Sequence, residues 1–241
     1  MSISTKSSAV ELVAPPMEGQ KTLVCTSVSA RTPAELRAKA QRAFNSGTDL
    51  VEFRLDSLRP FRSKAQEITE FLSRAILTVR SQGEGGDFEG REPDRLNAIR
   101  ASCELGPAYV DVELRTLRAN HDLVSELAGQ KLIVSWHDSL QTPPKARLAS
   151  ILAAAKAFGG LAKLVPTARE ASDNLAVLSL YGCRAPAPIA FCMGEAGVLS
   201  RVMAIELRTP IVYASLPGEQ TAPGQLTLSK LLALRRKLGC D

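Results

Sequence analysis

The sequence lacks a long apolar run. None of its 241 residues lies in a stretch near the roughly 20 consecutive apolar residues that cross a bilayer, and we therefore expect no membrane-spanning helix. The five cysteines form no CxxC pair and only two histidines occur, which leaves out the closely spaced ligands of zinc and redox motifs. We expect free cysteines in a reducing cytoplasm and no bound metal.

The sequence also lacks a strong excess of one charge. Lysine and arginine number 30 and aspartate and glutamate 25, which gives a net charge of +5. The one basic cluster, Arg235-Arg236-Lys237, falls at the end of the last predicted helix, where cations suit the helix dipole. We expect no nucleic-acid partner, whereas the modest positive field favours small anionic ligands.

The first twenty residues, MSISTKSSAVELVAPPMEGQ, are polar and lack the apolar core of a secretory signal. Glu11 and Glu18 also make them insufficiently basic for an organelle transit peptide, which is the weaker alternative. We expect residues 1–20 to form a tail, either flexible or folded as a short hairpin, and residues 21–241 to form one domain.

Beyond this tail, short apolar segments alternate with longer segments of helical spacing. The apolar segments are rich in valine, isoleucine and leucine, as is typical of buried parallel strands. Two helical segments follow a Thr-Pro pair, at residues 32–33 and 142–143, and several end near glycine, which are start and stop signals of helices. The predicted strands are residues 22–28, 49–56, 75–81, 109–114, 131–138, 161–167, 188–193 and 211–216. The clearest predicted helices are residues 34–44, 144–158, 169–181 and 226–238.

Eight strands alternating with helices indicate the α/β class with a parallel sheet. A closed barrel of this kind typically holds about 250 residues in one domain. An open Rossmann-type sheet is the alternative, but it would need a glycine-rich turn after an early strand, and residues 27–32 contain no glycine. We therefore predict a single-domain, eight-stranded parallel (β/α)8 TIM barrel.

Polar side chains alternate with apolar ones along several predicted strands. Glu52, Arg54 and Asp56 share one face of the second strand, because residues two apart point the same way. The following strands carry Thr78 and Arg80, Asp111 and Glu113, Ser135 and His137, and Lys163. Because barrel active sites lie at the carboxyl ends of the strands, we predict that these groups meet in one site. The alternative is an ion-paired layer that only fills the barrel.

Lys163 is the candidate nucleophile, because it lies in an apolar strand. Burial and nearby cations would disfavour its charged form and free an amine lone pair. Such an amine can attack a ketone and form an imine, whose protonated form accepts electrons from an adjacent carbanion. His137, at the end of the preceding strand, could move protons near neutral pH. The other histidine, His121, is expected on the surface of a helix.

Two glycine-containing loops follow predicted strands. The segment SQGEGG, residues 81–86, places Glu84 where a mobile loop could cover the site, although an ordinary turn is the alternative. The segment TAPGQ, residues 221–225, precedes the last helix, and the final loops of barrels often bind anions. Arg201, in the preceding helix or loop, could bind a carboxylate.

Seven short motifs, taken together and in order, resemble those of type I 3-dehydroquinate dehydratases. The motifs are EFRLD at 52–56, TVRS at 78–81, EGG at 84–86, SWHD at 135–138, AKLVP at 162–166, GVLSR at 197–201 and APGQ at 222–225. The resemblance extends from residue 22 to about residue 238 and leaves out the tail. Thr221 stands where serine is common in the family; it keeps the hydroxyl and adds a methyl group.

The resemblance implies a hydro-lyase that converts 3-dehydroquinate to 3-dehydroshikimate in the shikimate pathway of aromatic amino acid biosynthesis, as a cytoplasmic homodimer without cofactor. Lys163 would form a Schiff base with the substrate ketone and His137 would move the protons. Glu84 would support His137 and close over the site. The implied substrate-binding residues are Ser27, Glu52, Arg54, Arg80, Met193, Arg201, Thr221 and Gln225.

Two alternatives remain at this point. One is another Schiff-base lyase or class I aldolase barrel, which would favour a phosphate-binding loop where residues 221–225 lie. The other is a non-catalytic barrel that binds a carboxylated ligand as a sensor. Turnover of 3-dehydroquinate separates both from the first interpretation.

Overall fold

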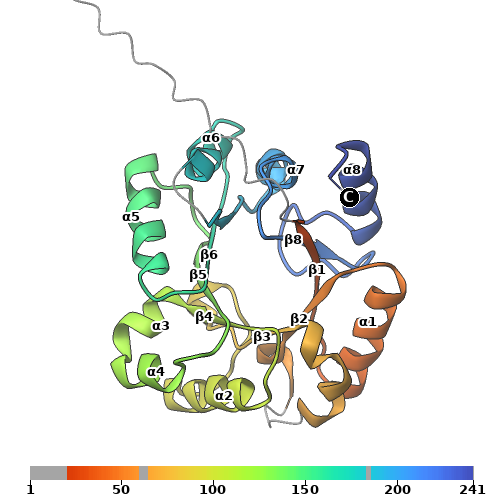
Figure 1. Ribbon diagram of the computed structural model, residues 1–241, viewed down its shortest axis with the longest axis vertical. Helices are drawn as coiled ribbons and strands as arrows, with labels where there is room; N and C mark the ends of the chain where they lie inside the picture. Colours follow the sequence, from red (N-terminus) through yellow and green to blue (C-terminus); the bar gives the residue numbers. More distant parts are fainter. Residues whose placement is uncertain (1–20, 60–64, 183–185, 241) are drawn as a thin grey trace, which may run out of the picture.

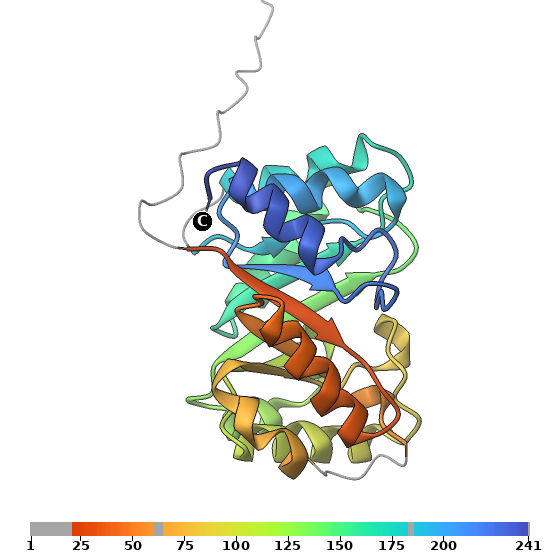
Figure 2. The same cartoon turned by 90° about the vertical axis from the view of Figure 1, so that its right-hand side faces the viewer.

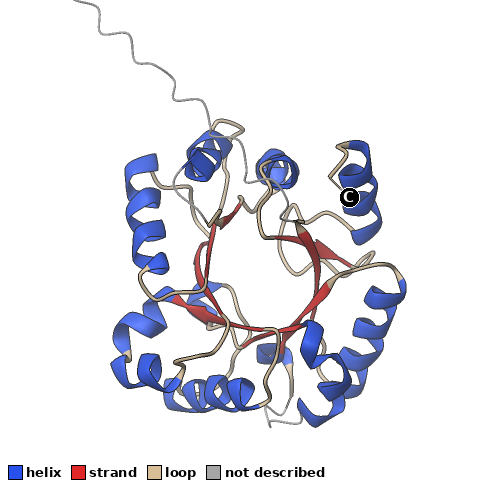
Figure 3. Ribbon diagram, in the orientation of Figure 1, coloured by secondary structure: helices blue, strands red, loops and turns tan. Residues whose placement is uncertain are grey.

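The computed structural model describes residues 21–59, 65–182 and 186–240. Its eight strands are all parallel and curl into a nearly closed ring, with the helices outside (Figure 1, Figure 3). The predicted (β/α)8 TIM barrel is confirmed. The predicted tail, residues 1–20, lies outside the described residues, as does Cys183.

The strands coincide with the eight predicted ones but are mostly shorter. They are β1 (Leu23–Val28), β2 (Leu50–Arg54), β3 (Ala75–Thr78), β4 (Tyr109–Glu113), β5 (Leu132–Asp138), β6 (Leu161–Pro166), β7 (Ile189–Ala190) and β8 (Ile211–Ser215). The prediction that Asp56 continues β2 is wrong, because it lies in a 3₁₀ turn, η1 (Leu55–Ser57). The last pair of the β2–β3 ladder is Arg54 with Thr78, so β2 has no partner beyond Arg54 on that side.

The hydrogen-bonded order of the strands is β7-β6-β5-β4-β3-β2-β1-β8. Among the described residues no ladder joins β7 to β8, so the barrel has a seam between these two strands. A backbone hydrogen bond crosses the seam above the strands, from the Gly194 nitrogen to the Pro223 oxygen at 3.1 Å. The seam also explains why β7 is short: it pairs with β6 alone.

Helices surround the barrel and cover the outer face of the sheet. They are α1 (Pro33–Asn45), α2 (Glu92–Glu104), α3 (Leu114–Ala119), α4 (His121–Glu126), α5 (Lys145–Lys156), α6 (Asp173–Leu178), α7 (Val198–Glu206) and α8 (Leu228–Lys237), with a 3₁₀ segment, η2 (Ala65–Arg74), between β2 and β3. In side view α1 and α8 lie outside β1 and β8 (Figure 2). His121 begins α4 and is exposed, as predicted.

Individual helix ends follow local signals where these are strong. The Thr32 hydroxyl accepts a hydrogen bond from the Glu35 nitrogen at 3.3 Å, and Pro33 occupies the first turn of α1. The predicted helix at residues 169–181 is divided into α6 and a 3₁₀ turn, η4 (Ser179–Gly182). Within the described residues every helix is too short or too polar to span a bilayer.

Apolar side chains fill both sides of the sheet. Val51 and Phe53 of β2 are fully buried in the outer layer, between sheet and helices, whereas Leu50 belongs to a second cluster inside the barrel. That inner cluster contains Cys25, Ile76, Ile133, Ile189, Ile211 and Tyr213, among others. The predicted alternation along β2 is therefore confirmed. The polar groups at the carboxyl ends of the strands pack above this inner apolar cluster.

Candidate active site

One cavity opens at the carboxyl ends of the strands, and the residues that the family resemblance implies as catalytic or substrate-binding line it. These residues are Ser27, Glu52, Arg54, Arg80, Glu84, His137, Lys163, Met193, Arg201, Thr221 and Gln225. Seven further residues, which the sequence did not predict, complete the lining: Gly85, Ser139, Val165, Phe191, Tyr213, Ala222 and Pro223. Asp56, the third charged residue predicted on β2, does not line the cavity. Its carboxylate accepts two hydrogen bonds from Arg54 instead.

Lys163 is buried on β6 and lies between acidic groups. Its Nζ donates a hydrogen bond to Asp111 Oδ2 at 3.1 Å and is 3.5 Å from Glu52 Oε1. The ring of Tyr213 lies 4.1 Å from the same nitrogen. We expected nearby cations from the sequence, but the charged groups nearest to the nitrogen are these two carboxylates.

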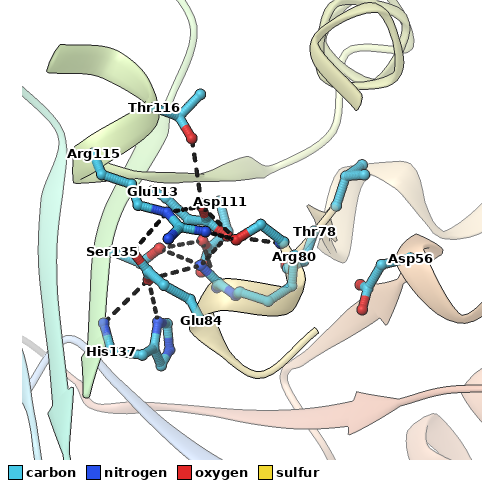
Figure 4. A network of polar contacts seen from close by, with 12 residues as sticks. Asp56, Thr78, Arg80, Glu84, Asp111, Glu113, Arg115, Thr116, Ser135 and His137 are labelled. Atoms are coloured by element: carbon cyan, nitrogen blue, oxygen red, sulfur yellow. Dashed lines mark hydrogen bonds and ion pairs between the residues drawn. The ribbon is translucent and has the colours of Figure 1, made fainter. Parts of the chain in front are cut away.

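Asp111, which accepts the hydrogen bond from Lys163, belongs to a network of polar contacts with Arg80 and Ser135 (Figure 4). Arg80 Nη2 donates to its Oδ1 at 2.7 Å, and the Ser135 hydroxyl donates to the same oxygen at 2.6 Å. Burial by itself would raise the pKa of Asp111, but the charges of Arg80 and Lys163 outweigh burial and hold it well below the usual range. Asp111 therefore remains an anion beside the lysine.

His137 is paired with Glu84. Glu84 lies in a 3₁₀ turn, η3 (Gln82–Glu84), and its Oε2 is 3.0 Å from His137 Nδ1 and accepts the His137 backbone N–H at 3.1 Å. Burial, then the positive charges of Arg80 and Lys163, hold the pKa of His137 well below its usual value. Burial raises the pKa of Glu84 to about 7, although Arg80 opposes this. An ionised Glu84 accepts the Nδ1 proton and leaves a lone pair on Nε2.

The turn that carries Glu84 depends on glycine. Gly85 has φ of 78°, a left-handed conformation that other residues rarely adopt. A Cβ at Gly86 would lie 2.2 Å from the Arg80 carbonyl oxygen. The chain can therefore fold back on β3 closely enough to bring Glu84 within hydrogen-bonding distance of His137, the pair that the family resemblance implies.

Arg201 projects from α7 into the cavity, and no acidic side chain of the described part of the chain pairs with it. Its Nε is buried and has no hydrogen-bond partner among the described residues, and its Nη2 donates only a long bond, 3.3 Å, to the Pro223 oxygen. The guanidinium carbon stands 4.6 Å from the Phe191 ring. Burial lowers the pKa of Arg201 to about 10. A buried guanidinium in this state is costly by itself and fits an anionic ligand.

Other predicted residues are positioned by hydrogen bonds to neighbouring side chains. The Ser27 hydroxyl donates to Glu52 Oε2 at 2.6 Å. Asp56 binds Arg54 through two bonds, at 3.0 and 2.7 Å, and so fixes its position. In the β8–α8 loop, the Thr221 hydroxyl donates to Gln225 Oε1 at 3.1 Å.

Tyr213 is the largest lining residue that the sequence analysis missed. It lies in an apolar strand, and the sequence alone suggests a residue of the hydrophobic core. The alternation along β8 nevertheless places it on the same face of the strand as Ser215, two residues later. Its hydroxyl is buried and has no hydrogen-bond partner among the described residues. Burial holds the pKa of Tyr213 well above its usual value, so the hydroxyl stays protonated.

The fold and this cavity define a (β/α)8-barrel enzyme with a buried lysine, a histidine paired with a glutamate, and an arginine that is left without an acidic partner within the described residues. Residues 24–239 match the model of the type I 3-dehydroquinase family, and the chain belongs to that family. It is therefore a hydro-lyase, as its sequence motifs predicted.

Named relatives agree with this assignment. The chain is 38% identical over 224 residues to 3-dehydroquinate dehydratase of Pyrobaculum aerophilum, covering 90% of this chain and 71% of that protein. It is 35% identical over 208 residues to the enzyme of that name from Pyrococcus abyssi, covering 85% and 94%. The crystal structure of 3-dehydroquinate dehydratase from Geobacillus kaustophilus has the same fold, with a TM-score of 0.81, 22% identity and 92% coverage of both chains.

Proposed function

We propose that this enzyme dehydrates 3-dehydroquinate to 3-dehydroshikimate through a Schiff base on Lys163. The observation that carries the proposal is that one cavity contains both a buried primary amine and a buried arginine that has no acidic partner among the described residues. The substrate offers a ketone to the amine and a carboxylate to the arginine. The names of the relatives support the same substrate.

The first step is imine formation. Lys163 gives up one proton to neutral His137, and its nitrogen then attacks the ketone carbon to form a carbinolamine. His137 returns the proton to the carbinolamine oxygen, which leaves as water, so that a positively charged iminium forms and His137 is neutral again. Asp111 and Glu52, which are within 3.1 and 3.5 Å of the lysine nitrogen, then face the iminium in place of the ammonium, so the charge balance of the site is kept.

The second step is elimination. Nε2 of His137 removes the proton next to the iminium carbon, and the electron pair moves onto the nitrogen to give an enamine. His137 returns this proton to the hydroxyl group on the neighbouring carbon, which departs as water while the new carbon–carbon double bond forms. Water then hydrolyses the conjugated imine, which releases the ketone product and the free lysine. The net change is the loss of one water molecule.

The substrate-binding roles follow from the partners that each residue has. Arg201, with Thr221 and Gln225 beside it, is proposed to bind the carboxylate. Ser27, Glu52, Arg54, Arg80 and Met193 are proposed to surround the hydroxylated ring. Since Arg80 is already engaged by Asp111 and Ser135, we assign it the further task of keeping Asp111 ionised.

Borohydride trapping tests the mechanism and the substrate together. The enzyme is incubated with 3-dehydroquinate and sodium borohydride, and the modified peptide is identified by mass spectrometry. We expect a stable adduct on Lys163 and loss of activity. Turnover with no adduct, or an adduct on another lysine, would contradict the proposal. Binding without turnover would support the sensor alternative, and turnover of sugar phosphates the aldolase alternative.

Replacing Arg201 by methionine is expected to raise KM for 3-dehydroquinate roughly 10- to 100-fold, because one charged hydrogen bond contributes about 1.5–3 kcal/mol. The melting temperature should stay equal or rise, because a buried unpaired charge is removed. Steady-state kinetics and thermal melts check both. An unchanged KM, or a loss confined to kcat, would remove Arg201 from carboxylate binding.

The rate is expected to depend on the protonation of Glu84. Its pKa is raised to about 7, so acidification through neutral pH protonates it, whereas His137 stays neutral because its pKa is lowered. A protonated Glu84 donates to Nδ1, and the histidine proton then occupies Nε2, which removes the base from the cavity. We expect kcat/KM to fall below a midpoint near pH 7, measured on folded enzyme, and a flat profile between pH 6 and 8 would contradict this role.

Membership of the family also supports a place in the shikimate pathway of aromatic amino acid biosynthesis, in the cytoplasm, and a homodimeric assembly. Light scattering on the purified chain would test the dimer, and a monomer mass would exclude it.

A further inference from the structure

Arg115, in the first turn of α3, bridges two acidic groups at the edge of the site (Figure 4). Its Nε is 3.0 Å from Glu113 Oε2 and 3.6 Å from Glu84 Oε1. The guanidinium also contacts the Ser81 hydroxyl. The side chain is half exposed, at 50%, and does not line the cavity. Arg115 nevertheless contacts Glu84, whose carboxylate is hydrogen-bonded to His137.

The backbone of the η3 turn is shaped to receive this guanidinium. A Cβ at Gly83 would lie 2.5 Å from Arg115 Nη1 and 2.8 Å from Nη2. The guanidinium therefore packs directly against the bare backbone of Gly83. Arg115 thus touches the turn at Ser81, Gly83 and Glu84, and it links the end of β4 to the segment that follows β3.

Few positive charges face Glu84. Arg80 Nη1 is 3.8 Å away, but this arginine is engaged by Asp111 and Ser135. His137 faces Glu84 at 3.0 Å, and Glu113 and Asp111 add negative charge from β4. Arg115 is the second cation beside Glu84 among the described residues. It also pairs with Glu113, which Arg80 and Arg95 face as well.

We propose that Arg115 is a positioning residue that keeps Glu84 ionised beside His137. This inference rests on the proposed function, in which neutral His137 is the base. Without the arginine, Glu84 would take up a proton at a higher pH. The histidine proton would then occupy Nε2, and the base would be lost over a wider pH range.

The test is the pH profile of kcat/KM for 3-dehydroquinate in four variants. Arg115→Met and Arg115→Gln remove the charge, Arg115→Lys retains it, and Arg100→Met removes a partly exposed arginine that is paired with Glu126 away from the cavity. We expect the acid limb to move up by about one pH unit in both neutral variants, since a nearby opposite charge shifts a carboxyl by about that much or more. The acid limb of Arg115→Lys should lie close to that of the wild type, and the acid limb of Arg100→Met should coincide with that of the wild type.

The inference would be overturned if the acid limb of either neutral variant coincided with that of the wild type. It would also be overturned if Arg115→Lys shifted the acid limb as far as the neutral variants do. The plateau rate at high pH should stay within about threefold of the wild type, because the catalytic groups are untouched. Thermal melts confirm that each variant is folded. If wild-type enzyme neither traps an imine nor turns over 3-dehydroquinate, the proposed function fails; if it does both and only the limb is unmoved, the role of Arg115 alone fails.

Discussion

Replacing Lys163 by alanine is expected to reduce kcat by about 10⁴-fold or more, because loss of the nucleophile in a covalent mechanism removes the whole route. Borohydride should then trap no adduct. Ligand binding should persist in part, because Arg201 and the β8–α8 loop remain in place. Single-turnover kinetics and calorimetric titration with 3-dehydroquinate measure the two effects, and an undiminished rate would refute the Schiff-base mechanism.

The contribution of the Lys163 charge to stability can be measured separately from the reaction of its amine. In Lys163→Ala the anions Asp111 and Glu52 lose a partner, and some loss of stability is expected because both are buried. Lys163→Arg keeps a positive charge opposite Asp111, yet a guanidinium does not form an imine under these conditions. This variant should be inactive like the alanine variant but more stable, as measured by thermal melts.

Replacing His137 by alanine is expected to lower kcat by roughly 10²- to 10⁴-fold, the usual contribution of a positioned acid–base group. Imine formation should be slowed but still detectable, because the amine of Lys163 and the carboxylate site are intact. Borohydride trapping over time distinguishes the two steps. Complete failure to trap, under conditions in which the wild type is modified, would contradict this division of roles.

His121 provides the matched control for this variant. It is the other histidine of the chain, and it lies exposed at the start of α4. His121→Ala should retain the wild-type rate and trapping. Loss of activity in both variants would point to a global effect of removing histidine instead of a role for His137 in the reaction.

Much of the site was predictable because it follows from local alternation. Glu52 and Arg54 could be assigned to the inside of the barrel since residues two apart in a strand share a face. Asp56 could not be placed correctly, because the length of β2 depends on the neighbouring strand β3, which ends at Thr78. The position of a strand end is a tertiary property, and the pattern of one strand does not contain it.

The partners of Lys163 were not predictable for a similar reason. Which groups surround its nitrogen depends on the stagger between strands, such as the pairing of Ser135 with Lys163. The pattern along β6 does not specify this stagger. Arg115 was missed because its contact with Glu84 joins a helix start to a turn 31 positions earlier. No periodic signal in the sequence relates two such segments.

The seam between β7 and β8 separates two kinds of task in this barrel. Lys163 and His137 belong to the continuous, hydrogen-bonded arc of the sheet, where each strand is fixed by two neighbours. Arg201 and Thr221 lie on opposite sides of the seam, in segments joined above it by the bond between Gly194 and Pro223. Under the proposed mechanism, a change of loop length or sequence there is expected to alter which acid is recognised, while the arc keeps the imine chemistry unchanged. The proposed reaction centre and the proposed recognition site could therefore diverge independently.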